Sequence, residues 1–206
     1  GTFNILVLNE DERSIPVLST SNEYMTTSFY LLAGKKIYKL NEDSNVKTFA
    51  RRIENGVSLR YFIENVSEVV VNFECLKSSE TSDYDTIKVS STVTNLKKAK
   101  NNFALKVIFD TVLGETDRHH FYNSNKEPVR NELSLRNFKY EKWFVSQNSS
   151  ASLQFLFEGS DITPPSLVAL ANYSTLANKK SWEPDMSTYK TFDTVLSYNN
   201  SAVGIY

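Results

Sequence analysis

Apolar and polar residues alternate with a period of two along most of this chain, and this pattern constrains the fold most strongly. The clearest runs are Phe3–Leu8, Tyr24–Leu32, Lys35–Leu40, Asn45–Ile53, Val57–Ile63 and Ser67–Leu76. A period of two is typical of β-strands with one buried face, whereas an amphipathic helix repeats every 3.6 residues. We therefore expect an all-β protein.

Short turn signals separate these runs. The Ala33-Gly34 step predicts a tight hairpin, and Asn55-Gly56 between alternating runs is the strongest hairpin signal in the chain. Thr86–Asn95 and Phe103–Asp110 are expected to form a long hairpin around a Lys-rich tip. A meander of roughly eight strands with short connections favours an antiparallel β-sandwich over a βαβ fold.

The second half of the chain is less regular. Glu132–Val145 and Ser152–Phe157 have strand character, and Ser166–Lys180 predicts either one short helix or an apolar strand followed by a turn. The simplest interpretation is a single antiparallel β-sandwich domain over residues 1–206, with at most one short helix. Because the chain ends inside the strand-like run Ser201–Tyr206, we expect the full-length protein to continue beyond Tyr206.

Composition limits the possible partners. The 206 residues include 23 basic and 24 acidic ones, for a net charge of −1, which argues against a nucleic-acid partner. No apolar run approaches the roughly 18–20 residues that a membrane-spanning helix needs, so we expect no transmembrane segment in this chain. Cys75 is the single cysteine, which excludes an internal disulfide, and the alternation predicts a buried, inert thiol.

Groups able to do chemistry are most concentrated between Asp110 and Phe121. A divalent-metal hypothesis would use Asp110, Glu115, Asp117 and His119, since carboxylates with imidazole suit zinc or manganese. The spacing matches no established metal-binding motif. His119 and its neighbour His120 would also point to opposite faces if the strand continued through them.

A structural turn is the interpretation that we favour for the same stretch. Asp110 and Thr111 would tie down the loop after the strand, and Gly114 would take a positive φ. In this interpretation the turn fixes how the two halves of the sandwich meet.

The sequence offers two further kinds of candidate site. Trp143, Trp182 and His120 are candidate contacts for a ligand or partner, and loop-forming residues around Trp182 predict that its ring is exposed. General acid–base catalysis would pair Asp110 or Glu115 with Asp161 or Asp193, although no local motif marks these carboxylates.

Other catalytic signatures are missing from the sequence, including the nucleophile elbow, the P-loop and the dinucleotide-binding fingerprint. We therefore expect no catalytic residues and no cofactor, with a divalent metal as the alternative.

Three passages resemble a group of spirochaete cell-envelope proteins: DTVLGETDRHHF (Asp110–Phe121), GSDITPPSLVALANYSTL (Gly159–Leu176) and SAVGIY (Ser201–Tyr206). In that group a strand ending in a DTxLGE-like turn precedes a TPP-like stretch. The resemblance implies a secreted or periplasmic β-sandwich and brings no activity with it. In architecture alone, a long meander also looks like the supersandwich of galactose mutarotase and of sugar-hydrolase accessory domains, whose catalytic His and Glu motifs are not matched here.

These observations lead to two hypotheses of different classes. The first is a non-enzymatic, extracytoplasmic structural or protein-interaction module, such as an accessory of a periplasmic cell-envelope or flagellar-motor assembly. The rival is a carbohydrate-binding or carbohydrate-processing domain, with Trp143, Trp182 and the carboxylates of the 110–121 turn lining a groove.

Overall fold

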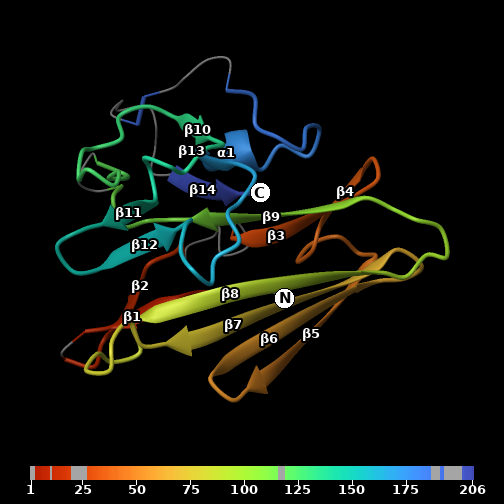
Figure 1. The fold of residues 1–206 in the computed structure, drawn as a ribbon, viewed down its shortest axis with the longest axis horizontal. Coiled ribbons are helices and arrows are strands. Elements are labelled where there is room, and N and C mark those ends of the chain that lie inside the picture. The colour runs from red at the N-terminus through yellow and green to blue at the C-terminus, as the bar shows by residue number, and fades with distance from the viewer. Residues whose placement is uncertain (1–2, 10, 20–26, 116–118, 187–190, 193–200) are drawn as a thin grey trace. The chain divides into compact units, whose positions relative to one another are not determined.

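The computed structural model describes residues 3–9, 11–19, 27–115, 119–186, 191–192 and 201–206 (Figure 1). The strands are β1 (Leu6–Leu8), β2 (Ser14–Pro16), β3 (Ser28–Ala33), β4 (Lys36–Lys39), β5 (Val46–Ile53), β6 (Gly56–Ile63), β7 (Ser67–Leu76), β8 (Thr86–Asn95), β9 (Phe103–Asp110), β10 (Leu133–Leu135), β11 (Trp143–Gln147), β12 (Ser152–Leu156), β13 (Val168–Asn172) and β14 (Ser201–Ile205). The helix α1 spans only Tyr173–Leu176. The predicted all-β, antiparallel, sandwich-like fold with one short helix is confirmed.

The chain divides into two compact units. Unit 1 comprises Tyr30–Ala104, and unit 2 comprises Thr2–Phe29 together with Leu105–Tyr206. That the two units form one domain over residues 1–206 stays a prediction. No helix among the described residues is long and apolar enough to cross a membrane.

Unit 1 contains a four-stranded antiparallel meander in the order β5-β6-β7-β8. A two-residue loop, Glu54 and Asn55, joins β5 to β6, which confirms the hairpin predicted from Asn55-Gly56. Gly56 is the first residue of β6, and a Cβ built on it would lie 1.8 Å from the carbonyl O of Phe73. Glycine is therefore needed at this position because β7 passes so close to it. The hairpin predicted at Ala33-Gly34 is also confirmed, with Gly34 at φ +63°.

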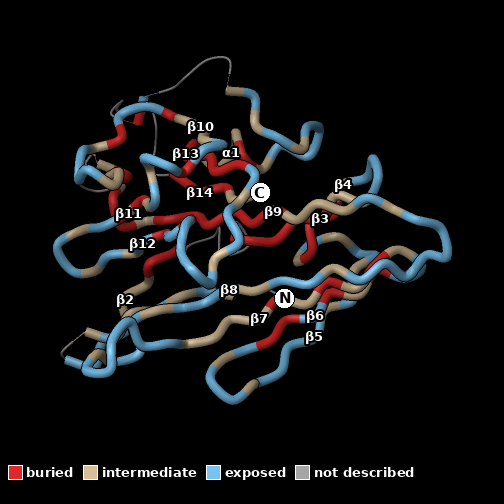
Figure 2. The backbone as a smooth tube through the Cα atoms, viewed as in Figure 1, coloured by how far each residue is buried: buried red, intermediate tan, exposed pale blue. Residues whose placement is uncertain are grey.

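One face of this meander is apolar. The strand registers place the following residues on that face: Val57, Leu59, Tyr61 and Ile63 of β6; Val69, Val71, Phe73 and Cys75 of β7; Ile87, Val89 and Val93 of β8. The period of two in the runs Val57–Ile63 and Ser67–Leu76 thus places their apolar residues on one face. Figure 2 shows that only part of β6 and of β7 is buried.

Unit 2 is built around β13 and β14, in each of which four of the five residues are buried. β14 pairs with β9 on one side and with β13 on the other, and β10 extends the sheet beyond β13. The hairpin β11-β12 packs against this sheet, because the ring centroids of Phe109 in β9 and Phe155 in β12 lie 5.3 Å apart. Aromatic packing of this kind between sheet and hairpin gives the unit its two-layered core.

One local prediction is wrong, and the structure refines two others. The hairpin expected between Thr86–Asn95 and Phe103–Asp110 does not form: β8 pairs with β7, and β9 pairs with β14. Glu132–Val145 contains two separate strands, β10 and β11. The stretch after Pro164-Pro165 combines both alternatives, since β13 comes first and α1 follows it directly.

Candidate functional site

The turn that follows β9 holds the first residue of β14. Thr111 donates hydrogen bonds from its backbone N–H and its Oγ1 to the carbonyl O of Ser201, over 3.2 and 3.1 Å. Glu115 Oε1 accepts the backbone N–H of Ser201 at 3.0 Å. Asp110 is 1% exposed at the end of β9, and its backbone N–H donates to Thr27 Oγ1 over 3.0 Å. Thr111 and Glu115 thus position the start of β14.

Gly114 is required for a different reason from the one that we expected. Its φ does not lie in the positive range. A Cβ on Gly114 would instead lie 2.5 Å from the carbonyl oxygens of both His119 and His120. The two arms of the turn approach each other too closely for any side chain at this position.

The two histidines lie in irregular backbone beyond this turn, and not in a continuing strand. His120 is 3% exposed, and its ring stacks on Phe192 with centroids 5.2 Å apart. The half-buried His119 ring lies 5.9 Å from that of Tyr122. Asp117 lies outside the described residues. Within the described part of the chain, no three His, Cys, Asp or Glu side chains form a group able to hold a metal ion.

The carboxylates considered for acid–base catalysis have unlike surroundings. Asp110 is buried, whereas Asp161 is exposed in the loop after β12. Asp193 lies outside the described residues.

Trp182 forms part of a buried cation site, although we expected its ring to be exposed. The ring is half-buried and lies 5.0 Å from Nζ of Lys106, and Tyr206 contributes a second ring at 5.1 Å. The Lys106 ammonium donates to the carbonyl oxygens of Leu176 and Trp182 over 3.2 and 3.1 Å. Its side chain is 1% exposed, and this burial lowers the pKa of Lys106 to about 8. The site fastens the segment after α1 to the central sheet of unit 2.

Trp143 is half-buried in β11, where its backbone is fixed by Ser124. The Ser124 hydroxyl donates to the carbonyl O of Trp143 over 3.3 Å. Trp143 and Trp182 therefore do not form a pair of freely exposed stacking platforms.

The apolar face of β5–β8 has an open end in unit 1. Leu59, Tyr61, Val69 and Val71 on this face are at most 4% exposed. Further along the same face, Val57 is 43%, Ile87 is 38% and Val89 is 40% exposed. One continuous apolar face is thus covered at one end and open to solvent at the other.

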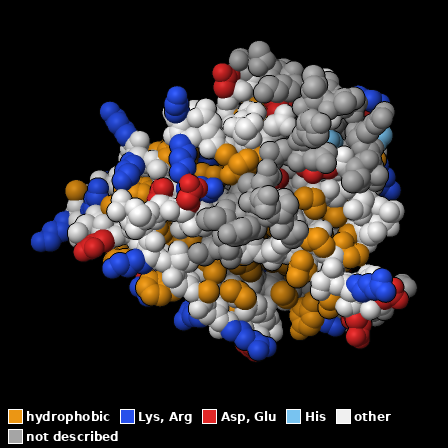
Figure 3. All heavy atoms as spheres, turned by 180° about the vertical axis from the view of Figure 1, so that it is seen from behind, with side chains coloured by type: hydrophobic (Ala, Val, Ile, Leu, Met, Phe, Trp, Pro, Cys, Tyr) orange, Lys and Arg blue, Asp and Glu red, His pale blue; other side chains and the backbone are white. Residues whose placement is uncertain are grey.

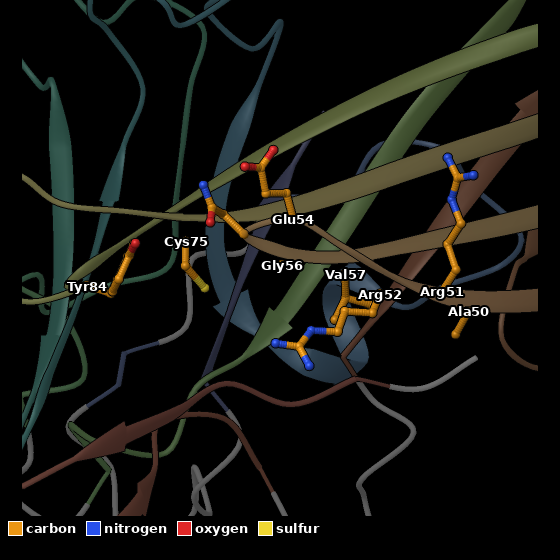
Figure 4. A pocket seen from close by; sticks show the side chains of 9 residues that line it. Ala50, Arg51, Arg52, Glu54, Gly56, Val57, Cys75 and Tyr84 are labelled. Carbon is orange, nitrogen blue, oxygen red and sulfur yellow. The ribbon is translucent and has the colours of Figure 1, made fainter.

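A shallow pocket of about 640 Å³ lies at this open end (Figure 4). Its lining residues are Ala50, Arg51, Arg52, Glu54, Asn55, Gly56, Val57, Cys75 and Tyr84. Figure 4 shows Arg51 and Arg52 extending in opposite directions, as expected for neighbours in a strand. Cys75, predicted to be buried, is half-buried and lines this pocket.

Tyr84 supplies the aromatic ring of the pocket lining, and it is 64% exposed. The loop that carries it is fixed by Asp85, whose carboxylate accepts the Ser78 hydroxyl at 2.5 Å and the Ser78 N–H at 2.8 Å. These hydrogen bonds, the hydroxyl first, lower the pKa of Asp85 below its ordinary value. These hydrogen bonds thus join the two ends of the loop that carries Tyr84.

The pocket lining holds two basic side chains, Arg51 and Arg52, and one acidic side chain, Glu54. Residues 30–104 hold 12 basic and 9 acidic side chains, for a net charge of +3. Neither Arg51 nor Arg52 forms an ion pair with a described residue. On the face drawn in Figure 3, Lys and Arg side chains project among exposed hydrophobic ones and form no continuous basic surface.

Sequence reasoning missed the pocket and the Lys106 site for the same reason. Alternation shows which residues share a face, but it does not show whether another element covers that face. A lysine in the apolar run FALKVIFD is the one available signal for a buried cation, because its neighbours two positions away are Ala104 and Ile108.

Comparison with protein-family models, with curated proteins and with solved structures finds no match to this chain.

Proposed function

We propose that this chain is a non-enzymatic protein-interaction module, and that its binding surface is the open end of the apolar face of β5–β8. The observation that carries the proposal is the change along that face, from Val69 and Val71 at 0% exposure to Val57 at 43% and Val89 at 40%. Contiguous exposed apolar side chains next to a pocket are typical of surfaces that bind another protein.

The side chains that line the pocket indicate which kind of partner segment would bind there. Val57, Tyr84 and Cys75 offer an apolar surface, and Arg52 lies on the same face as Val57, its neighbour across the strands. A segment with an apolar side chain beside an aspartate or glutamate would complement both features, since charge complementarity guides association and specificity.

Cys75 provides a direct test because it is the single cysteine and lines the pocket. A photo-crosslinker attached to Cys75 should link the partner, which mass spectrometry then identifies. The dissociation constant of that purified partner is then measured for Val57→Ser and Arg52→Ala. Each substitution should weaken binding severalfold, because the first removes apolar contact area and the second removes the complementary charge.

The matched control is Phe49→Ser. Phe49 is 55% exposed on the opposite face of the same sheet, where it lies across from Arg60. An unchanged dissociation constant for both pocket variants, or an equal loss for the control, would contradict the proposed surface.

We further propose that the module acts outside the cytoplasm, as an accessory of a cell-envelope or flagellar-motor assembly. The support is the resemblance carried by Asp110–Phe121, Gly159–Leu176 and Ser201–Tyr206. Fractionation of cells that express the full-length protein tests it, and recovery only with cytoplasmic markers would refute it.

The carbohydrate-binding rival gains no observation of its own. Its best platform, Trp182, packs against Lys106 and Tyr206 inside unit 2. A glycan array answers the question directly, because glycan binding that is lost in Trp143→Ala would favour the rival over the protein-interaction module.

A further inference from the structure

β8 is a long strand at the edge of the β5–β8 sheet. It spans ten residues and, among the strands that the structure describes, it pairs with β7 alone. Most of its side chains are exposed, including Lys88 and Thr94. An edge strand of this kind offers a row of backbone N–H and C=O groups that another strand can pair with.

The hydrogen bonds that are observed fix which groups face the free edge. The Leu96 N–H donates to the carbonyl O of Val66 over 3.2 Å, and hydrogen-bonded pairs recur at every second residue of an antiparallel ladder. Residues 88, 90, 92 and 94 therefore direct their backbone groups toward β7. Ile87, Val89, Ser91 and Val93 direct theirs away from it.

The other side of β7 gives an independent check on this assignment. The Cys75 N–H donates to the carbonyl O of Asn55 over 2.7 Å, so the odd-numbered residues of β7 bond to β6. Its even-numbered residues are then left to bond to β8, in agreement with the first assignment.

The two edges of the sheet are protected to different degrees. β5 carries Lys47, Arg51 and Arg52 within eight residues, and charged side chains on an edge strand oppose pairing with another copy. β8 carries only Lys88 within ten residues. The edge of β8 is thus the less protected of the two.

We propose that the edge of β8 pairs with β8 of a second copy of this chain, antiparallel and around a two-fold axis at Ser91. In this register Val89 lies opposite Val93 of the second copy, and Lys88 lies opposite Thr94. Each residue on the apolar face thus lies opposite a residue on the apolar face of the second copy. No charged side chain lies opposite another of the same sign. A two-fold contact uses the same surface on both copies, so a strand complementary to itself is well suited to it.

The register gives a matched pair of variants. Ser91→Pro removes an N–H that points away from β7, which an edge strand tolerates, whereas Ser91→Ala keeps that N–H. Sedimentation equilibrium across the micromolar range should show twice the 23.5 kDa chain mass for wild type and Ser91→Ala. Ser91→Pro should stay at the mass of one chain, with an unchanged far-ultraviolet circular dichroism spectrum. A monomeric wild type, or a dimeric Ser91→Pro, would overturn the inference.

A second variant keeps the test decisive if Ser91→Pro fails to fold. In the proposed register Ser91 lies opposite Ser91 of the second copy and forms a hydrogen-bonded pair with it. The Cα atoms of such a pair lie about 5.5 Å apart, a distance that a disulfide can span. Ser91→Cys in a Cys75→Ser background should therefore form a covalent dimer on mild oxidation. Thr86→Cys in the same background should not, and equal crosslinking of both would exclude this register. Neither outcome depends on the pocket variants, so the dimer and the proposed function can fail separately.

Discussion

The buried ammonium of Lys106 makes the stability of this chain depend on pH in a defined direction. Burial lowers its pKa from 10.5 to about 8 in the folded state, while the unfolded chain keeps the ordinary value. The unfolded state therefore binds more protons between these two values. Since stability rises with pH wherever the unfolded state holds more protons, the cost of burying this charge falls as pH increases from 8 toward 10.5.

The perturbation that isolates this effect is Lys106→Met, which keeps most of the aliphatic stem and removes the titrating group. Integrating the linkage relation from about pH 7 to about pH 9.5 gives a gain of about 2 kcal/mol for wild type relative to the variant. Groups that titrate in both proteins cancel in this difference. Loss of the two hydrogen bonds to Leu176 and Trp182 shifts the variant by a constant amount at every pH.

The assay is urea denaturation of both proteins at several pH values, with Lys100→Met as a control on an exposed turn. Fluorescence adds a local measurement, because the chain has two tryptophans and Trp143→Phe leaves Trp182 as the single reporter. Its emission should titrate near pH 8 because Nζ of Lys106 lies 5.0 Å from the ring. A difference in unfolding free energy that stays constant over this pH range would refute the burial argument, as would an emission change that survives in Lys106→Met.

Three further substitutions test close contacts by urea denaturation. Gly114→Ala should destabilise by about 2 kcal/mol or more, because its Cβ would lie 2.5 Å from backbone oxygens, whereas Gly159→Ala meets only a flexible Ile side chain at 3.2 Å. Gly56→Ala should be at least as costly, since its Cβ would lie 1.8 Å from a β7 carbonyl oxygen. Glu132→Ala should lower the free energy of unfolding by about 1–3 kcal/mol, because the Asn172 N–H loses the acceptor Glu132 Oε1, which lies 2.8 Å away. Glu132→Gln should cost less, because it keeps an acceptor oxygen.

Local signals in the sequence were sufficient for the hairpins but not for the sheets. Asn55-Gly56 and Ala33-Gly34 mark turns whose strands are neighbours in sequence, so both hairpins were predicted correctly. The partner of β9 could not be read in this way, because β14 lies more than ninety residues further along the chain. Most residues of both strands are buried, so the burial of side chains from distant segments favoured this pairing over pairing with the nearer strand β8.

The candidate residues of the 110–121 turn were likewise predicted where local signals were enough, and missed where distant segments meet. Sequence reasoning identified Thr111 and Gly114 as parts of a turn, but the contact of Thr111 with Ser201 needs the β9–β14 pairing. Gly114 was assigned a positive φ because that is the commonest reason for a glycine in a turn. The actual reason is the approach of the His119 and His120 backbone, which only the folded chain brings near.

The lining of the pocket and the backbone edge of β8 are formed by different groups, and this difference has a measurable consequence. Val89 contributes its side chain to the open apolar face and its backbone to the edge. The pocket is lined by residues 50–52 and 54–57, Cys75 and Tyr84, whereas the proposed dimer uses the backbone of β8 around Ser91. Antiparallel pairing keeps the apolar faces of both copies on one side of the joined sheet, so a dimer would present two pockets on that side. Two sites held together bind a densely immobilised partner more tightly than one, because the second contact forms at a high effective concentration.

Ser91→Pro should therefore dissociate faster than wild type from a surface crowded with the partner identified through Cys75. In solution, where each pocket binds one free partner molecule, the two proteins should have the same dissociation constant. Tyr84→Ser should weaken both measurements, because Tyr84 lines the pocket itself and is 64% exposed. If Ser91→Pro weakened binding equally in solution and on the surface, the edge and the pocket would form one site, and the separation argued here would be wrong.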